Sequence, residues 1–375
     1  MDPRYSVALT DWLACARRGR REPAAAAARR ASEDASGRVV AAGAAGHVLD
    51  YDDTYVPGLC HLSAPIAPVA CILGADSGAS IADVLAGYAV GVETMAALAS
   101  ASHPALYARG WHPTAVCGAV GAAAAAGSVL GLDERATRVA TSLALLRAGG
   151  LLAAFGSDGK ALQVGLAAAT GLTAARLAAA GARVPTSVRS GFESAYEGRW
   201  DDPGESPSIA DNWIKAYPCC LQTHAAIEAA DEARRAGAVP QRARVVVHPV
   251  SRRAAPYDDV GSGLEAKFSI PYTVALTLLH GPPSVDDFTS AREDVRALAR
   301  NITVATDADV GESEAVLETP EGFSRRVAAA LGSPQRPMTE NQLQRKVHSL
   351  AGAELDGVVD EMDRPAKILV EAARL

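Results

Sequence analysis

The residues most able to do chemistry begin with a dense acidic group, Asp50-Tyr51-Asp52-Asp53-Thr54, followed seven residues later by His61. As a string of letters, this group fits the D-x-D-x-T signature of magnesium-dependent phosphohydrolases, whose first Asp is a nucleophile and whose second is a general acid. That chemistry requires the motif at the end of a buried strand, where both carboxylates reach one metal ion and one phosphate. Residues 41–49 are mostly Ala and Gly and predict no such strand, which disfavours the phosphohydrolase hypothesis.

A helix that continues through the acidic group is the alternative. His47, Asp50, Asp53 and Thr54 would then fall at positions i, i+3, i+6 and i+7, share one face and line one pocket. Alternatively, Asp52 and Asp53 would form a solvated helix end, and His47 would be a hydrogen-bonded core histidine. For Asp52, both interpretations stay open.

Three further segments carry candidate catalytic groups. In Trp111-His112-Pro113-Thr114, the Pro suits the first turn of the apolar helix that follows, which places His112 near a helix N-terminus, a natural site for an anion. Gly156-Ser157-Asp158-Gly159-Lys160 ends in a Lys before another helix, but it lacks the Walker spacing of a P-loop. The vicinal cysteines of Lys215-Ala216-Tyr217-Pro218-Cys219-Cys220 predict packing or pocket residues rather than a redox pair. Taken alone, His112 and Lys160 could equally be ordinary loop residues.

Composition and charge exclude several classes of protein. Apolar residues make up 49% of the 375 residues, enough to bury a large core, so disorder is excluded. The net charge is −7, with no dense basic run outside residues 17–21, which argues against nucleic acid or an anionic membrane as a partner. The six cysteines show neither a CxxC pair nor zinc-site spacing, so we expect no metal site and a cytoplasmic location.

No membrane-spanning or secretory segment is expected. Residues 113–132 carry no charge over about one bilayer width, but they are mostly Ala and Gly rather than the larger apolar residues that favour insertion. Small residues let helices pack closely, so a buried helix is expected here. Near the N-terminus, Asp11 interrupts the apolar run and arginines follow it, which is not a secretory pattern.

The hydrophobic pattern divides the chain into two parts. Residues 1–236 carry long Ala-rich segments that exceed strand length and predict an all-helical domain. A small α+β domain is expected over 239–338. Its predicted elements are strands over 244–248 and 302–305, a hairpin over 314–327, and helices over 272–279 and 286–298. Thr339 and Gln342 have capping-box spacing, and a last helix over about 353–375 is expected to pack back on the first domain. The predicted fold class is mainly α.

The order and spacing of the polar segments resemble the MmgE/PrpD family, which includes 2-methylcitrate dehydratase, cis-aconitate decarboxylase and iminodisuccinate epimerase. The resemblance covers nearly the whole chain from about residue 38, and five ordered motifs are far more specific than any one. The motifs are Leu49-Asp50-Tyr51-Asp52-Asp53-Thr54 with His61, Trp111-His112-Pro113-Thr114, Phe155-Gly156-Ser157-Asp158-Gly159-Lys160-Ala161-Leu162, Lys215-Ala216-Tyr217-Pro218-Cys219-Cys220, and Lys267-Phe268-Ser269-Ile270-Pro271-Tyr272.

The resemblance implies a large helical domain with an α+β lid domain, a homodimer, and catalysis on a small carboxylic acid without metal or organic cofactor. Carried over by motif, it implies a pocket lined by Asp50, Thr54, His61, His112, Lys160 and Lys215, with Cys220 and Tyr272 close by.

In this scheme the two lysines neutralise substrate carboxylates and developing negative charge, and His61 or His112 moves the proton. Asp50 orients a His or acts as the partner base, and Thr54 positions a carboxylate. Tyr272 by itself predicts a core residue.

Two departures from the family pattern bear on the substrate. The segment Lys160-Ala161-Leu162-Gln163-Val164-Gly165 stands where the family usually has Lys-Pro-Leu-His-x-Gly. Leu146-Arg147 replaces the usual Ser-His or Ser-Gln before Ala148-Gly149-Gly150. Arg147 would therefore either bind a carboxylate of the substrate or be a surface cation.

Three functions follow from these observations. The first is a cofactor-independent lyase that dehydrates or decarboxylates a di- or tricarboxylic acid. The second is an epimerase or isomerase of a related acid, and the third is a non-catalytic dimeric binding protein. The joint presence of Asp50, His61, His112, Lys160 and Lys215 argues against the third, because a silent pocket has no chemical need for all five.

Overall fold

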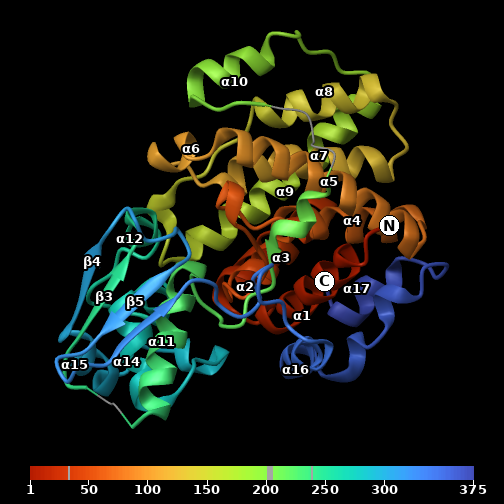
Figure 1. Ribbon diagram of the computed structural model, residues 1–375. Helices are drawn as coiled ribbons and strands as arrows, with labels where there is room; N and C mark the ends of the chain where they lie inside the picture. Colours follow the sequence, from red (N-terminus) through yellow and green to blue (C-terminus); the bar gives the residue numbers. More distant parts are fainter. Residues whose placement is uncertain (33, 201–205, 238–239) are drawn as a thin grey trace.

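The computed structural model describes residues 1–32, 34–200, 206–237 and 240–375. It consists of a helical part and a smaller part built on a four-stranded sheet (Figure 1). The chain passes from the first to the second after β2 (Asn212–Trp213), and it returns to the helical part after β6 (Ser324–Val327). The predicted mainly α fold with a smaller α+β domain is confirmed.

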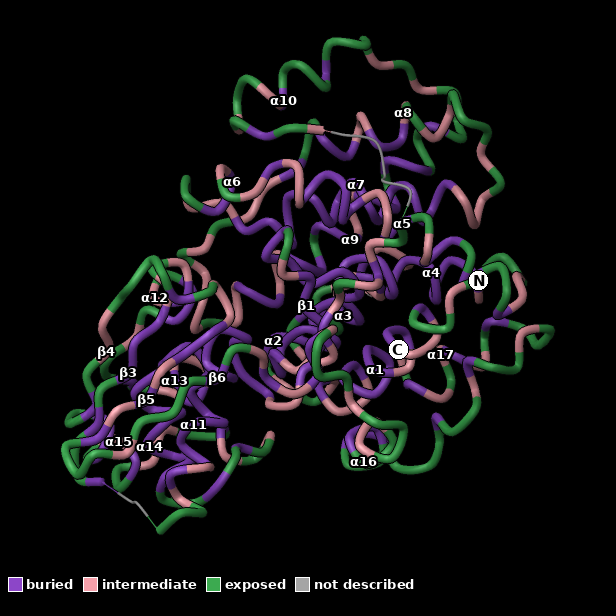
Figure 2. The backbone as a smooth tube through the Cα atoms, viewed as in Figure 1, coloured by how far each residue is buried: buried purple, intermediate pink, exposed green. Residues whose placement is uncertain are grey.

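Three long helices form the centre of the helical part: α5 (Ile81–Ser102), α7 (Pro113–Val129) and α9 (Asp158–Ala179). Helix α7 packs against both of the others, and its backbone is buried (Figure 2). Glycine makes this close approach possible, because a Cβ on Gly91 of α5 would lie 2.8 Å from the carbonyl oxygen of Gly121 in α7. The expected buried helix after residue 113 is therefore present.

Shorter helices surround this centre. They are α1 (Arg4–Gly19), α2 (Pro23–Ala31), α3 (Ala35–His47), α4 (Ser63–Ser77), α6 (Ala105–Ala108), α8 (Glu134–Leu145) and α10 (Val188–Tyr196). Helices α5 and α9 are long and apolar enough to cross a membrane by length and composition alone. More than half of the apolar window of each is buried inside the protein, 56% and 61%, which is the burial that core helices also show.

The sheet of the smaller part has the strand order β4-β3-β5-β6. Strand β3 (Ala243–Val247) pairs in parallel with β4 (Ile302–Thr306) and antiparallel with β5 (Ala315–Glu318), which forms a hairpin with β6. The strands and the hairpin were expected from the sequence. Helix α11 (His224–Arg235) packs against β5 and β6, and α14 (Ile270–His280) packs against β4 and α15 (Glu293–Ala299).

Several predicted elements need correction. Residues 1–236 are not entirely helical, because β1 (Thr54–Tyr55) pairs with β2, and α11 packs on the sheet rather than among the helices. The helix expected over 286–298 is divided into a 3-10 turn (Val285–Phe288) and α15.

The C-terminal region also differs from the prediction. Thr339 caps α16 (Glu340–Ala351) with the expected capping box, but no continuous helix follows. Gly352 and Gly357 adopt φ values of 71° and 67°, and two 3-10 turns precede the short α17 (Lys367–Ala373). Helix α16 packs against α1, and α17 packs against α4.

Candidate active site

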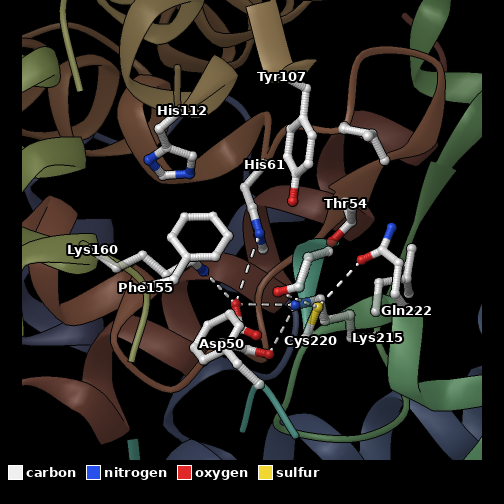
Figure 3. Close-up of a pocket in the computed structure, with 14 residues that line it drawn as sticks. Asp50, Thr54, His61, Tyr107, His112, Phe155, Lys160, Lys215, Cys220 and Gln222 are labelled. Atoms are coloured by element: carbon white, nitrogen blue, oxygen red, sulfur yellow. Dashed lines mark hydrogen bonds and ion pairs between the residues drawn. The ribbon is translucent and has the colours of Figure 1, made fainter. Parts of the chain in front are cut away.

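Residues of both parts line a small pocket with a cavity volume of about 30 Å³ (Figure 3). Its polar lining residues are Asp50, Thr54, His61, Tyr107, His112, Lys160, Lys215, Cys220 and Gln222. The apolar ones are Leu59, Phe155, Leu221, Ala254 and Phe268. The structure thus brings together every residue of the predicted site except Tyr272 and Arg147.

The acidic group forms a loop and not the helix considered above. Helix α3 ends at His47, and Asp50 adopts a left-handed backbone conformation with φ 52°, which Asp tolerates better than most residues. Thr54 then opens β1. The interpretation of His47, Asp50, Asp53 and Thr54 as one helix face is therefore wrong, although Asp50 and Thr54 still reach the same pocket.

Three consecutive carbonyl oxygens of this loop each accept a hydrogen bond from a different buried lysine. The bonds run from Lys267 Nζ to Leu49 O (2.6 Å), from Lys215 Nζ to Asp50 O (3.0 Å) and from Lys346 Nζ to Tyr51 O (2.8 Å). The three lysines lie far apart in the sequence, and each belongs to a different segment of the fold. Together they fix the backbone of the loop, so the unusual conformation of Asp50 is determined by its surroundings.

The Asp50 carboxylate lies between two ammonium groups. Lys160 Nζ donates to Asp50 Oδ1 at 2.5 Å, and Lys215 Nζ lies 3.2 Å from the same oxygen. Burial would raise the pKa of Asp50, but the two lysines outweigh burial and hold this pKa well below its usual range. Burial likewise opposes the charge of Lys215, whose pKa is nevertheless raised by Asp50. Two ammonium groups and one carboxylate leave an excess of positive charge, which suits an anionic ligand.

Lys346 connects the acidic loop to the N-terminal helix. Its Nζ lies 2.7 Å from Asp11 Oδ1 of α1 and 4.0 Å from the centre of the Tyr51 ring. The side chains of Lys346 and Asp11 are 3% and 0% exposed, so this is a fully buried ion pair. The contact therefore fixes the loop to both ends of the helical part.

Replacing Lys346 by Met is expected to lower the free energy of unfolding by about 3–5 kcal/mol, the usual cost of removing one partner of a buried ion pair. Asp11 would be left as an unpaired buried carboxylate, and the carbonyl of Tyr51 would lose its donor. Urea unfolding of Lys346→Met, Asp11→Leu and the double variant measures the coupling. The double variant should lose clearly less than the two single losses combined, whereas additive losses would contradict the pairing.

His61 is backed by a buried carboxylate. Its Nδ1 lies 3.1 Å from Asp52 Oδ2, and the same oxygen lies 2.9 Å from His47 Nδ1. The contact with Asp52 favours a proton on Nδ1 of His61, which leaves a lone pair on Nε2, the atom that lies 3.7 Å from Asp50 Oδ1. Burial lowers the pKa of His61 to about 3 despite Asp52, and Lys215 and Lys160 add to the effect. His61 is therefore neutral at pH 7, and its Nε2 lone pair faces the pocket.

His47, Asp52 and His61 present donor atoms within 4.8 Å of one another, close enough to hold a metal ion. Asp52 Oδ2, however, is already hydrogen-bonded to His47 Nδ1 at 2.9 Å, and His61 Nδ1 lies 3.1 Å from the same oxygen as an ion-pair contact. Imidazole donors keep a buried carboxylate ionised, and the pKa of Asp52 is lowered by His47 and His61 even though burial opposes this. We therefore interpret these three residues as a polar group in which Asp52 binds His47 and lies next to the ring of His61.

His112 has the opposite tautomer. Gln163 Oε1 accepts from the backbone N–H of Leu151 at 2.9 Å, which fixes the orientation of the amide. Its Nε2 then donates to His112 Nδ1 at 2.7 Å, so a neutral His112 carries its proton on Nε2. Burial, reinforced by Lys160, holds the pKa of His112 well below its usual range. His112 is thus neutral and able to donate a proton, and Pro113 opens α7 directly after it, as predicted.

The remaining acidic residue and Thr54 have different roles. Asp53 accepts from the backbone N–H of Ser63 at 3.1 Å, from Ser63 Oγ at 2.5 Å and from Asn212 Nδ2 at 2.8 Å, so it joins the loop to α4 and β2. It does not line the pocket. Thr54 Oγ1 is buried, lines the pocket and has no hydrogen-bond partner among the described residues, which leaves it available to a ligand.

Three further residues of the predicted site are placed as follows. Cys220 is buried, lines the pocket and donates to Gln222 Oε1 at 3.3 Å. Tyr272 is buried in the core of the smaller part, where its hydroxyl accepts from the backbone N–H of Arg292 at 3.0 Å. Arg147 is exposed, just beyond α8. Assignment of Tyr272 and Arg147 to the pocket is therefore not supported by this geometry, because the first fills a core and the second lies on the surface.

The buried histidines predict acid sensitivity. Burial lowers the pKa of His224 to about 3, so between pH 6.5 and 3 the unfolded chain binds one more proton than the folded one. Stability is therefore lost as pH falls below about 6.5, by about 1.4 kcal/mol per pH unit for such a residue. His47, His61 and His112 act in the same direction, whereas Asp53, whose pKa burial and Asp52 raise to about 7, partly offsets them.

The measurement is the free energy of unfolding at pH 4.5–6.5, and the variant is His224→Gln, because His224 does not line the pocket. The slope of this variant should be lower than that of the natural sequence by about 1.4 kcal/mol per pH unit. Replacement of the exposed Gln344 by Ala provides the control and should leave the slope unchanged, because it removes no titratable group. Equal slopes in all three proteins would contradict a neutral buried His224.

The fold and the site together place the chain in a known family. The MmgE/PrpD N-terminal domain matches residues 38–199, and the MmgE/PrpD C-terminal domain matches residues 217–372. Because these matches cover most of the sequence, the protein belongs to the MmgE/PrpD family, as the polar motifs predicted.

Curated relatives include cis-aconitate decarboxylases of mammals. The mouse and human proteins are each 28% identical to this chain over 345 residues, which cover 82% of the chain and 70% and 71% of the relatives. A cis-aconitate decarboxylase-like protein of Aspergillus oryzae is 32% identical over 174 residues, which cover 41% of the chain and 36% of that protein.

Sequence reasoning missed several residues of the site. The role of Asp52 was left open, because a helix through the acidic group would point its side chain away from the pocket. Lys267 and Lys346 bind the loop from positions 218 and 295 residues away along the chain. Lys267 opens a family motif but was given no role, and Lys346 belongs to no motif. Tyr107 and Gln222 line the pocket without belonging to a motif.

Proposed function

We propose that the protein is a lyase that acts on a di- or tricarboxylic acid of the cis-aconitate type, by proton transfer at a carbon next to a carboxylate. The observation that carries the proposal is the pair of buried ammonium groups on either side of Asp50, facing a pocket that also contains two neutral imidazoles. The curated cis-aconitate decarboxylases support the same class of reaction.

Binding follows from charge. Lys160 and Lys215 share one carboxylate, so a substrate carboxylate that enters the pocket completes the charge balance. Thr54 Oγ1, which lacks a protein partner in the described structure, would donate to a second carboxylate oxygen. Ammonium groups held in a buried site also stabilise the enolate-like charge that develops when a proton or CO₂ leaves the adjacent carbon.

The two imidazoles have complementary roles. His61, with its lone pair on Nε2, is the base, and His112, with its proton on Nε2, is the acid. In a decarboxylation, the bond to the departing carboxylate breaks, CO₂ leaves, and the electron pair moves through the neighbouring alkene to a carbon that takes the Nε2 proton of His112. The imidazolate left on His112 takes a proton back from water when the product departs. In a dehydration, His61 removes the proton next to a carboxylate and the Nε2 proton of His112 goes to the departing hydroxyl, which leaves as water. His61 then releases its proton and His112 regains one through solvent, which restores both neutral rings.

No metal or organic cofactor is required by this scheme, because the two lysines supply the positive charge that stabilises the intermediate. The same groups would epimerise an acid if His61 removed a proton from one face of a carbon and His112 returned one to the other. That alternative has no leaving group, so its products differ measurably from those of a lyase.

The test is proton NMR of chelator-treated protein in D₂O with cis-aconitate, citrate, 2-methylcitrate and aspartate-derived dicarboxylates, each added separately. Loss of CO₂ or of water from one of them is the expected result. Deuterium incorporation without net loss would replace the lyase proposal with the epimerase alternative. Activity that disappears with chelator and returns with a divalent metal would overturn the metal-free scheme and reassign the group of His47, Asp52 and His61.

Two variants distinguish a lyase from a non-catalytic binding protein. His61→Ala should abolish turnover while thermal unfolding changes little. Lys215→Ala should also abolish turnover in a chain that still folds, at a lower unfolding temperature because the carbonyl oxygen of Asp50 loses its donor. Turnover that is unchanged in both variants would sink the assignment of these roles. Binding of an acid by the natural protein with no conversion of any acid in the panel would favour the binding protein.

A further inference from the structure

A second cavity lies away from the pocket, between α1, α2, α3 and the end of α17. It has a volume of about 300 Å³, the lower end of the range typical of small-molecule sites. Four arginines line it: Arg20 at the end of α1, Arg29 of α2, Arg38 of α3 and Arg374 after α17. The cavity shares no lining residue with the candidate active site.

Within the residues that the structure describes, most of the positive charge of this cavity has no carboxylate partner. Arg38 forms an ion pair with Asp76 at 2.6 Å. Over the described residues, Arg20, Arg29 and Arg374 have no carboxylate within ion-pair distance, and the Nε atom of Arg20 is buried without a hydrogen-bond partner. Burial lowers the pKa of Arg20, and Arg29 and Arg374 lower it further, as expected for cations that repel one another. Like charges held together in this way are stabilised by a bound anion.

Small apolar side chains also line the cavity. Ala41, Ala42 and Ala45 of α3 line it together with Ala16 of α1. The two helices meet closely at this point, because a Cβ on Gly19 would lie 2.1 Å from the carbonyl oxygen of Ala45. The lining of the cavity therefore combines guanidinium groups with small apolar side chains.

We propose that this cavity binds a small polyanion, with phosphate or carboxylate groups on Arg20, Arg29 and Arg374 and a less polar body on the alanines of α3. Guanidinium groups bind both kinds of anion through paired hydrogen bonds, so the shared chemistry is a molecule with at least two such charged groups. The proposal does not depend on the function proposed for the active site. Helix α3 ends at His47, however, so a ligand here contacts the helix that leads into the acidic loop.

Calorimetric titration at low ionic strength tests the proposal with ADP, pyrophosphate and citrate as separate probes. We expect saturable binding of at least one probe at one site per chain, and a Kd raised at least about tenfold in Arg20→Ala and Arg29→Ala, the loss typical of hydrogen bonds to a charged group. Arg30→Ala is the matched control, since Arg30 is exposed on the same helix as Arg29 and does not line the cavity. ADP or pyrophosphate binding would identify a phosphate ligand, and citrate binding alone a carboxylate.

Citrate also fits the active-site proposal, so its titration is repeated with Lys160→Met, which should leave the arginine site intact. Binding that disappears in Lys160→Met but persists in Arg20→Ala belongs to the active site and does not support this cavity. Absence of saturable binding by all three probes would overturn the proposal. So would an equal loss of affinity in Arg30→Ala, because it would indicate diffuse attraction to a basic surface.

Thermal unfolding gives a second, independent result. If the arginines repel one another in the free protein, Arg20→Ala and Arg29→Ala should unfold at the same or a higher temperature than the natural sequence. A lower unfolding temperature in both variants would show that the arginines are bound within the protein, and the proposal would fail. Protection of the natural protein by the bound probe should disappear in both variants.

Discussion

Replacement of Lys160 by Met should lower kcat/KM for the carboxylic acid substrate by about 10²–10³, the loss found when one charge-stabilising donor is removed from an active site. The Lys160 ammonium group lies 2.5 Å from Asp50 Oδ1 and within 5.3 Å of the centres of the Phe155 and Phe268 rings. Met keeps the length of the side chain and its contact with the rings but removes the charge. The attraction for a substrate carboxylate is then lost, because one ammonium and one carboxylate balance each other.

Because one ammonium group and one carboxylate remain paired, we expect the Lys160→Met variant to stay folded. Asp50 retains Lys215 as its partner. Lys215 Nζ lies 3.2 Å from Asp50 Oδ1 and 3.0 Å from the carbonyl oxygen of Asp50, so no buried charge is left unpaired. Steady-state kinetics and thermal unfolding measured on the same preparation separate the two effects. Lys367→Met, on the exposed side of α17, is the control and should change neither. An activity loss below tenfold, or a loss that only accompanies unfolding, would refute the role of Lys160.

Replacement of His112 by Gln should lower kcat by about 10²–10⁴, the usual contribution of a general acid or base, with a much smaller change in KM. Its proton is held on Nε2 by Gln163, so the neutral ring is ready to donate. Gln cannot deliver a proton at neutral pH, although it retains hydrogen-bonding capacity. Rapid-quench or NMR progress curves at saturating substrate give kcat directly.

Gln163 distinguishes a positioning role from simple packing. In Gln163→Glu, the carboxylate would accept from His112 Nδ1–H instead of donating to it, which moves the proton away from Nε2 and raises the pKa of the ring. The activity of this variant should fall, and its pH profile should shift upward. Gln163→Met should lose activity without that shift. An unchanged profile in Gln163→Glu would show that the tautomer of His112 does not depend on this residue.

Much of the site could be predicted from the sequence because local rules determine it. Pro113 opens α7 directly after His112, and Ser157 caps α9 so that Lys160 lies in its first turn. Both positions follow from capping and turn chemistry over a few residues. The capping box of Thr339 and the hairpin of β5 and β6 were predictable for the same reason.

The acidic loop could not be predicted in the same way. Helical periodicity assigns each of its residues to a face, but the left-handed conformation of Asp50 ends that period and turns Asp52 toward His47 and His61. This conformation is stabilised by lysines that only the tertiary fold brings near. Tyr272 shows the converse, since a residue within a family motif fills the core of the smaller part and contributes to the site only through the scaffold.

The hydrogen bond from Lys346 to the carbonyl oxygen of Tyr51 has a consequence for the synthesis of the chain. Residues 49–61, which carry Asp50, Asp52 and His61, leave the ribosome long before Lys346, yet the loop receives its third support only when α16 has packed against α1. A nascent chain that lacks α16 would therefore contain all the acid and base groups without their final arrangement. The loop therefore reaches its final arrangement only after the segment that carries α16 has been synthesised and has packed against α1.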